Sequence, residues 1–295
     1  MSRWPNFFIV GAGKSGTSSL NRYLKDIPGI YMSPVKEPNY FSINFVFENA
    51  PNPKPIRSEE KYLNLFANAK DEKILGEAST PYLEDPEVPH LIYEKTPGAR
   101  ILISLRNPIE KVYSAYLMWK NQKRISGDFH EYVQKELKRK DPQNIKRKYL
   151  GLYYDNVKRY LEVFGKDQVK IIIFEDWVKD PKPTLNEILK FLGSTETLNN
   201  FKNVIYNPYR ETRGPIAQYI RKNWLVKKTA RLFLSSSSRK SLGRKLYIKN
   251  EKKPKMNKND REELKKFHYD DVQKLQTLLG RELPWEDFQT KDLIP

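Results

Sequence analysis

A glycine-rich segment near the N-terminus has the composition of an anion-binding loop. Residues 11–19 read GAGKSGTSS, in which Gly13 and Gly16 flank Lys14. Glycines let the backbone approach an anion, and a helix that begins directly after them presents free N–H groups and a partial positive charge. Lys14 adds a full charge. We predict that this loop binds a phosphate-type group, with hydroxyl donors from Ser15, Thr17, Ser18 and Ser19.

The loop departs from the ATP-binding pattern G-x-x-x-x-G-K-[ST]. That pattern would align with Gly13, Lys14 and Ser15, but it requires glycine at position 8, where Phe8 stands inside a predicted strand. A nucleotide with fewer phosphates at this end fits the short loop better. A P-loop nucleotide kinase or ATPase remains an alternative, with Asp176 in IIIFED as the acidic strand end for magnesium.

A second anion site is predicted after the apolar run ILISL (101–105). Arg106 leaves the carboxyl end of this strand, Asn107 can cap the following helix, and Ser114 lies two turns along it. A guanidinium and a hydroxyl together can bind a phosphate. Because parallel strands end at the same sheet edge, we expect Arg106 to lie beside the glycine loop.

Strand-like runs alternate with helical periodicity along the chain, which predicts an α/β fold with a central parallel sheet flanked by helices. We expect one domain over 1–295, a helix start at Asp260 with Glu263 as its cap partner, and a mobile basic loop at 235–258. Residues 31–97 show no clear pattern. Strands are predicted at 7–10, 101–105 and 169–177, and helices at 20–27, 109–117, 153–164 and 185–192.

The motifs GAGKSGTSSL and LRNPIEKVYSAY together resemble the sulfotransferases that use 3′-phosphoadenosine 5′-phosphosulfate (PAPS). The resemblance extends to the C-terminal DVQKLQTLLGRELPW and so covers nearly the whole chain. It implies a P-loop-like fold, a 5′-phosphosulfate loop around Lys14, and a 3′-phosphate site at Arg106 and Ser114. The implied reaction transfers a sulfuryl group from PAPS to a hydroxyl or amine, releases 3′-phosphoadenosine 5′-phosphate (PAP), and requires no metal.

The segment SPVKEPNYFS resembles an element of heparan-type, carbohydrate-acting sulfotransferases whose glutamate is the catalytic base. This implies that Glu37 is the base, with Lys36 beside it. None of the three histidines lies in the motif of the enzymes that use a histidine base. Where the carbohydrate-acting enzymes often carry Glu-Lys, this chain has Glu77-Ala78, so Glu77 is expected to orient the site, with Ser79 or Tyr82 lining it.

Two further regions are expected to complete the donor site. Tyr153 follows a basic stretch and is expected near the nucleotide. The segment YNPYRETRG resembles a late loop of the family, which implies that Arg213 and Gly214, and next Arg210, close over the 3′-phosphate. Adenine is expected to stack on an aromatic side chain, Phe201 or Tyr206.

The chain has 295 residues, no cysteine and a net charge of +18. Segment 221–258 carries a net +13 and segment 120–150 a net +6, so the rest is close to neutral. We expect 221–258 to approach an anionic acceptor or a membrane surface, or only to confer solubility. Nucleic-acid binding is the weaker alternative, because stacking aromatics are not interleaved with the basic residues. Without a signal-peptide pattern or a spanning apolar stretch, a cytoplasmic location is expected.

Overall fold

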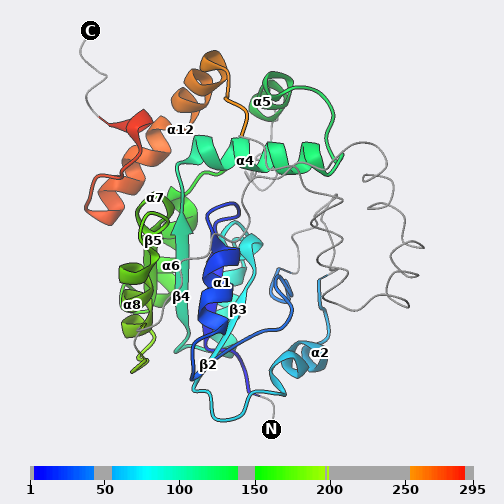
Figure 1. Cartoon of the computed structure of the whole chain (residues 1–295), viewed down its shortest axis with the longest axis vertical. Coiled ribbons are helices and arrows are strands. Elements are labelled where there is room, and N and C mark those ends of the chain that lie inside the picture. Colours follow the sequence, from blue (N-terminus) through cyan, green and yellow to red (C-terminus); the bar gives the residue numbers. More distant parts are fainter. Residues whose placement is uncertain (1–2, 43–54, 139–149, 197, 199–252, 290–295) are drawn as a thin grey trace.

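A computed structural model describes residues 3–42, 55–138, 150–196, 198 and 253–289. Its centre is a five-stranded, wholly parallel sheet in the order β2-β3-β1-β4-β5, as the alternation of strands and helices predicts (Figure 1). The strands are β1 (Phe7–Gly11), β2 (Ile30–Met32), β3 (Ile74–Ala78), β4 (Arg100–Leu105) and β5 (Val169–Ile173).

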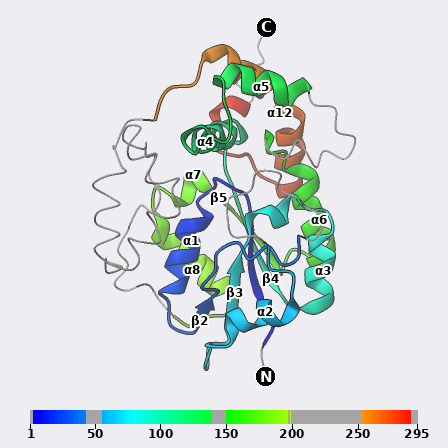
Figure 2. The ribbon, with the colours of Figure 1, turned by 90° about the vertical axis from the view of Figure 1, so that its right-hand side faces the viewer.

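Helices cover both faces of the sheet and one of its edges. Figure 2 shows α1 (Thr17–Lys25) and α8 (Pro181–Phe191) on one face, and α3 (Val88–Lys95) and α6 (Tyr154–Phe164) on the other. Helix α4 (Pro108–Asn121) crosses above the carboxyl ends of the strands. The remaining elements are α2 (Glu59–Leu63), η1 (Asn64–Phe66), η2 (Thr80–Leu83), α5 (Phe129–Lys138), α7 (Phe174–Trp177), α12 (Lys258–Leu279) and η4 (Glu286–Phe288).

The hydrophobic core consists of two clusters, one on each face of the sheet, and alternate side chains of β1 contribute to each. Phe7 and Ile9 belong to the apolar cluster beneath α1 and α8, whereas Phe8 and Val10 belong to the larger cluster beneath α3 and α6. All four side chains are fully buried. The continuous apolar run is therefore that of a strand covered on both faces, and it delivers the glycine loop to the carboxyl edge of the sheet. Within the described residues, no helix has the length and apolarity to cross a membrane.

Strands β2 and β3 lie in the segment without a clear sequence pattern. They are short, and β3 contains Gly76 and Glu77, two residue types that are uncommon in strands. A Cβ atom on Gly76 would lie 2.4 Å from Met32 Sδ and 2.8 Å from a ring carbon of Phe7. Glycine is therefore required by the close packing of neighbouring strands and side chains, which only the tertiary fold reveals.

The strand predicted over 169–177 is too long. Strand β5 ends at Ile173, and the next four residues form the helical turn α7. This turn directs Trp177 back under the glycine loop, where its Nε1 donates a hydrogen bond to Ser104 Oγ at 3.3 Å. Burial of the indole at this position accounts for the end of the strand.

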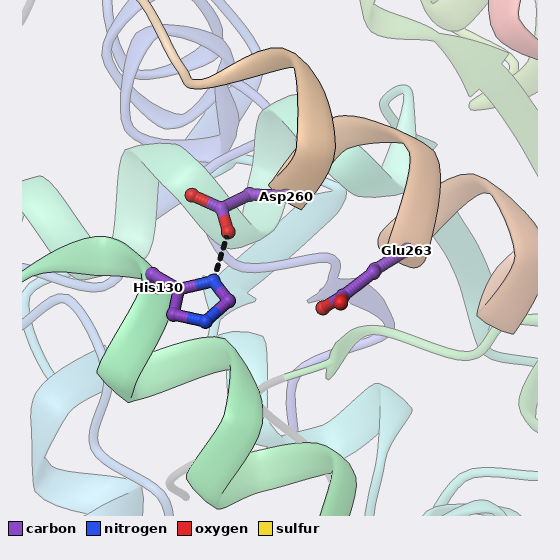
Figure 3. A group of neighbouring side chains, drawn as sticks. All are labelled: His130, Asp260 and Glu263. Atoms are coloured by element: carbon purple, nitrogen blue, oxygen red, sulfur yellow. Dashed lines mark hydrogen bonds and ion pairs between the residues drawn. The ribbon is translucent and has the colours of Figure 1, made fainter.

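The predicted cap of the C-terminal helix is also wrong. Helix α12 has Asn257 as its N-cap, whose side chain accepts a hydrogen bond from Asn259 N at 2.9 Å. Asp260 is buried and instead binds His130 Nδ1 on α5 at 2.6 Å, with Glu263 nearby on the same helix (Figure 3). These contacts join α5 to α12.

Candidate functional site

The glycine loop connects β1 to α1 and is held against β4. Ala12 N donates to Ser104 O at 2.8 Å, and Ser104 Oγ donates to Ser15 O at 2.7 Å. Gly16, the N-cap of α1, makes no side-chain capping bond and has a φ of 79°. The first turn of α1 therefore has no side-chain cap, which is the arrangement that suits an anion at a helix N-terminus.

Gly16 has a steric requirement that a substitution can test. A Cβ atom on Gly16 would lie 2.2 Å from Trp177 Cζ2 and 3.0 Å from Phe174 Cδ2, at a left-handed φ of 79°. We expect Gly16→Ala to lower the free energy of unfolding by about 2–4 kcal/mol, because it combines overpacking with backbone strain. Urea unfolding of Gly29→Ala is the matched control. Gly29 has a similar φ of 75°, but a Cβ atom added to it would have no neighbouring atom within 4 Å. Equal losses in both variants would contradict the steric argument.

Lys14 lies at the centre of the loop, and its side chain reaches α4. Its Nζ lies 3.5 Å from Met118 Sδ, and its backbone adopts a φ of 65°. Burial, together with the charges of Arg106 and Lys36, lowers the pKa of Lys14 to about 8. Two further cations thus lie close to this ammonium group, and such a concentration of positive charge favours a multiply charged anion.

Arg106 is held in place at the end of β4 by its surroundings. Its Nη1 donates to Lys14 O at 3.1 Å, and its guanidinium carbon lies 4.6 Å from the ring centre of Phe174. The Nε atom is buried and has no hydrogen-bond partner among the described residues. Ser15 Oγ, in the adjacent loop, is another buried polar atom without a partner in this part of the chain. An anion bound here would satisfy unpaired donors, so the residues fit a phosphate group.

Tyr153 holds the backbone of Arg106 through a hydrogen bond. The fully buried phenol donates to Arg106 O at 2.8 Å, and its backbone N–H donates to Asp271 Oδ2 at 2.8 Å. Burial raises the pKa of Tyr153 well above its usual value, so the hydroxyl remains a donor. The structure thus places Tyr153 next to Arg106, in the predicted second anion site, with its hydroxyl already hydrogen-bonded to the backbone.

Helix α4 presents one face to both segments that are predicted to bind anions. Asn107 caps it as predicted, accepting from Ile109 N at 3.0 Å. Glu110, Ser114 and Met118 are spaced four residues apart and so share a face. Because Met118 contacts Lys14, half-buried Ser114 lies on the face that meets the loop.

Two cations near this face were not predicted as site residues. Lys253 Nζ lies 2.6 Å from Glu110 Oε2, and Arg261 Nη1 lies 3.0 Å from Glu110 Oε1. Burial and the positive charge of Arg106 lower the pKa of Lys253, although Glu110 opposes the shift. In the sequence Lys253 counted only toward the basic segment 221–258, and no local motif distinguishes it.

Glu37 lies in a loop that runs beside β3 and approaches Lys14. Its Oε1 accepts hydrogen bonds from Lys36 Nζ at 3.0 Å and from Thr80 Oγ1 at 2.8 Å. Among the described residues no hydrogen bond reaches Oε2. Glu37 also influences the pKa of Lys14, which places its carboxylate near the ammonium group. One carboxylate oxygen is thus fixed by donors, and the other can accept a proton.

Glu175 and Asp176, the acidic pair that a kinase would need for magnesium, are engaged elsewhere. Glu175 accepts from Asn107 N and from Trp285 Nε1, both at 3.0 Å. Asp176 Oδ2 lies 3.1 Å from Arg281 and is half exposed. These carboxylates connect α7 to α4 and to the C-terminal segment, so the geometry does not support the kinase alternative.

Three of the predicted site residues converge, whereas others lie outside the described part of the chain; no histidine is among the predicted site residues. Lys14, Arg106 and Glu37 come from three distant segments and converge at the carboxyl edge of the sheet. His268 is fully buried between Leu264 O and Leu150 O, which excludes it as a base. Several predicted residues lie outside the described part of the chain: Arg213, Gly214, Arg210, Phe201, Tyr206 and most of the basic loop 235–258.

The chain is similar to known proteins in sequence and in fold. The family model described as "Sulfotransferase domain" matches residues 5–278. Human carbohydrate sulfotransferase 15 is 27% identical over 247 residues, covering 64% of this chain and 44% of its own. Human bifunctional heparan sulfate N-deacetylase/N-sulfotransferase 2 is 28% identical over 211 residues, covering 67% of this chain and 23% of its own. The chain thus spans less than half the length of these relatives.

A solved structure matches over nearly the full length. The sulfotransferase from Alicyclobacillus acidocaldarius is 34% identical, with a TM-score of 0.70, and the match covers 95% of this chain and 98% of that one. The parallel sheet, the glycine loop and the helix above it therefore belong to a fold that a solved sulfotransferase shares.

Proposed function

Because the chain belongs to the sulfotransferase domain family, we propose that it transfers the sulfuryl group of PAPS to a hydroxyl or amine of a glycan or another small molecule, without a metal. One observation carries the proposal. Lys14 in the glycine loop, Arg106 at the end of β4 and Glu37 meet at one sheet edge, and within the described part of the chain one oxygen of Glu37 has no hydrogen-bond donor. These are the groups that the donor's two anionic ends and the acceptor's proton require.

The donor is assigned to the two anion sites. The loop 13–19 and Lys14 would bind the 5′-phosphosulfate, because uncapped helix N–H groups and an ammonium group stabilise a dianion. Arg106 and Ser114 would bind the 3′-phosphate, which would provide a partner for Arg106 Nε. The positive charge of Arg106 lowers the pKa of Lys253, so Lys253 lies near Arg106 and would add a second cation there.

Transfer is assigned to Lys14 and Glu37. Glu37 Oε2 would remove the proton of the acceptor as its oxygen or nitrogen bonds to sulfur. The bond between sulfur and the bridging phosphate oxygen breaks, and Lys14 would neutralise the charge that develops on that oxygen. The products are the sulfated acceptor and PAP, so atoms and charge balance without a further reactant.

The proposed acceptor class rests on relatives and on charge. The named relatives are a carbohydrate sulfotransferase and a heparan sulfate N-deacetylase/N-sulfotransferase, and the segment at 36–38 of this chain resembles the Lys-Glu-Pro element of carbohydrate-acting sulfotransferases. The chain lacks the lysine that often follows their glutamate, because Ala78 stands there. The basic segment 221–258 would favour an anionic acceptor or a membrane surface rather than nucleic acid. A cytoplasmic location stays a prediction. A screen of labelled PAPS against glycan and small-molecule acceptors tests the class directly.

The donor assignment is tested by calorimetric titration with PAP and 5′-AMP. We expect PAP to bind about 10- to 100-fold more tightly, because charged hydrogen bonds to the 3′-phosphate add about 1.5–3 kcal/mol. Arg106→Ala should remove most of that difference. Arg100→Ala is the matched control, since Arg100 begins β4 at the opposite end and donates to Asp167 O. Equal affinity for PAP and AMP in the unmodified protein would refute the 3′-phosphate site.

A further inference from the structure

Glu77 is a fully buried carboxylate that the proposed reaction does not use. It lies near the carboxyl end of β3, where Tyr62 OH donates to Oε1 at 2.8 Å and Ser79 Oγ donates to Oε2 at 3.0 Å. The phenol of Tyr82 also lies close to Glu77, whose charge raises the pKa of that phenol. A buried charge is costly unless it is hydrogen-bonded, so these hydroxyls are what allow Glu77 to be ionised in the core.

The same hydroxyls bind the loop that carries Glu37. Ser79 Oγ accepts a hydrogen bond from Asn39 N at 3.1 Å, and Tyr82 OH accepts one from Phe41 N at 3.2 Å. Glu37 N itself donates to Ala78 O at 2.9 Å. Every second amide of the loop is therefore attached to the segment that begins at Glu77.

Glu77 determines the direction of these bonds. A serine hydroxyl has one proton, and Ser79 gives that proton to Glu77, which leaves its oxygen lone pairs for Asn39 N. An ionised carboxylate can only accept, so it enforces this direction. A glutamine in its place would present an NH₂ group to one of the hydroxyls. That hydroxyl would then have to accept from the amide side chain and would lose its fixed orientation toward the loop.

The loop needs such support because its backbone is strained. Glu37 has a φ of 63° and Asn39 a φ of 51°, both in the left-handed region that non-glycine residues rarely adopt. Strain of this kind persists only where the surroundings hold it, and it concentrates at functional sites. We propose that Glu77 is a positioning residue, whose hydroxyl network holds the 37–41 loop so that Glu37 faces the acceptor; this rests on the proposed function.

The ionisation of the network supports this role. Burial raises the pKa of Glu77 to about 7, against the hydrogen bonds that lower it. The ionisable groups that face it are the phenols of Tyr62 on α2, Tyr82 on η2 and Tyr160 on α6, and burial raises the pKa of each. The phenols therefore remain donors, and Glu77 is the group of this set that changes charge near neutral pH. As pH falls through about 7, Glu77 gains a proton, so one of its oxygens becomes a hydroxyl that can donate, and the group no longer enforces the direction of the surrounding hydrogen bonds.

The first test is Glu77→Gln in the full chain. We expect kcat to fall about 10- to 100-fold, because a displaced base loses its alignment, while the dissociation constant for PAP stays within about twofold. Hydrogen exchange should become faster in peptides that cover 37–41. The wild-type kcat should fall below pH about 7, and this dependence should be absent in Glu77→Gln. Asp260→Asn, another buried carboxylate remote from the loop, is the matched control and should change none of these quantities.

Substitutions at Ser79 keep the proposal falsifiable if Glu77→Gln folds poorly. Ser79→Ala removes the hydroxyl and should reproduce the loss of kcat and the faster exchange, whereas Ser79→Thr keeps the hydroxyl and should retain most activity. Unchanged kcat and exchange in both Glu77→Gln and Ser79→Ala would overturn the proposal. If hydrogen exchange is faster in Glu77→Gln and Ser79→Ala while Glu37→Gln is fully active, the assignment of Glu37 as the base is wrong. The network then holds the loop without a role in catalysis.

Discussion

Replacing Lys14 with alanine is expected to lower kcat about 100- to 1,000-fold. A cation aimed at developing charge in a buried site contributes several kcal/mol to transition-state stabilisation, and its removal has effects of this size. Lys14 lies in the loop that would hold the 5′-phosphosulfate. The Arg106 side chain donates a hydrogen bond to the backbone carbonyl oxygen of Lys14. Initial rates at saturating PAPS measure the effect.

The control for this substitution is Lys25→Ala, which removes an exposed lysine from the last turn of α1. It should leave kcat unchanged. A Lys14→Ala protein that retains wild-type kcat would show that the leaving oxygen is neutralised elsewhere, and Lys253 would become the next residue to substitute.

The depressed pKa of Lys14 adds a pH dependence whose sign is defined. Burial and neighbouring cations lower the pKa to about 8, so Lys14 loses its charge as pH rises through this value. We expect kcat/KM for PAPS, which reports the free enzyme, to fall above pH about 8. The arginine in Lys14→Arg should keep its charge to higher pH. The fall in kcat/KM should therefore begin at a higher pH in this variant, even if its absolute activity is lower.

Glu37→Gln is expected to lower kcat about 100- to 10,000-fold while PAP binding is retained. The amide cannot accept the acceptor's proton, and general-base catalysis contributes effects of this size. The substitution preserves shape and leaves an oxygen for the bond from Thr80, so the donor site should be intact. Single-turnover assays with PAPS, together with PAP titration, separate the two quantities.

Glu60→Gln, on the exposed side of α2, serves as the control for removal of a carboxylate and should have wild-type kcat. Normal turnover by Glu37→Gln with every accepted acceptor would require another base. His268 is not a candidate, because burial lowers its pKa to about 4 and backbone carbonyls engage its ring.

Local sequence patterns predicted most of the elements that carry the site. The apolar run at 7–10 and the run at 101–105 became β1 and β4, adjacent and parallel, and the helix after Pro108 began as predicted. Local sequence patterns did not predict the strands correctly where tertiary packing outweighs the intrinsic strand propensity of the residues. Strand β3 contains Gly76 and a buried Glu77, and β5 ends early because Trp177 turns back beneath the glycine loop.

The sequence by itself determined the chemical groups of the site and the order of the elements: Lys14 in its glycine loop, Arg106 after a strand, and Glu37 in its Lys-Glu-Pro element. The glycine loop and the strand followed by arginine are local patterns that elementary helix and strand physics can interpret. Only the tertiary structure decided how these groups are supported. Ser79 and Tyr82 bind a loop about 40 residues away, and Lys253 meets Glu110 across 143 residues. Such contacts depend on side-chain packing between distant segments, which no local pattern encodes.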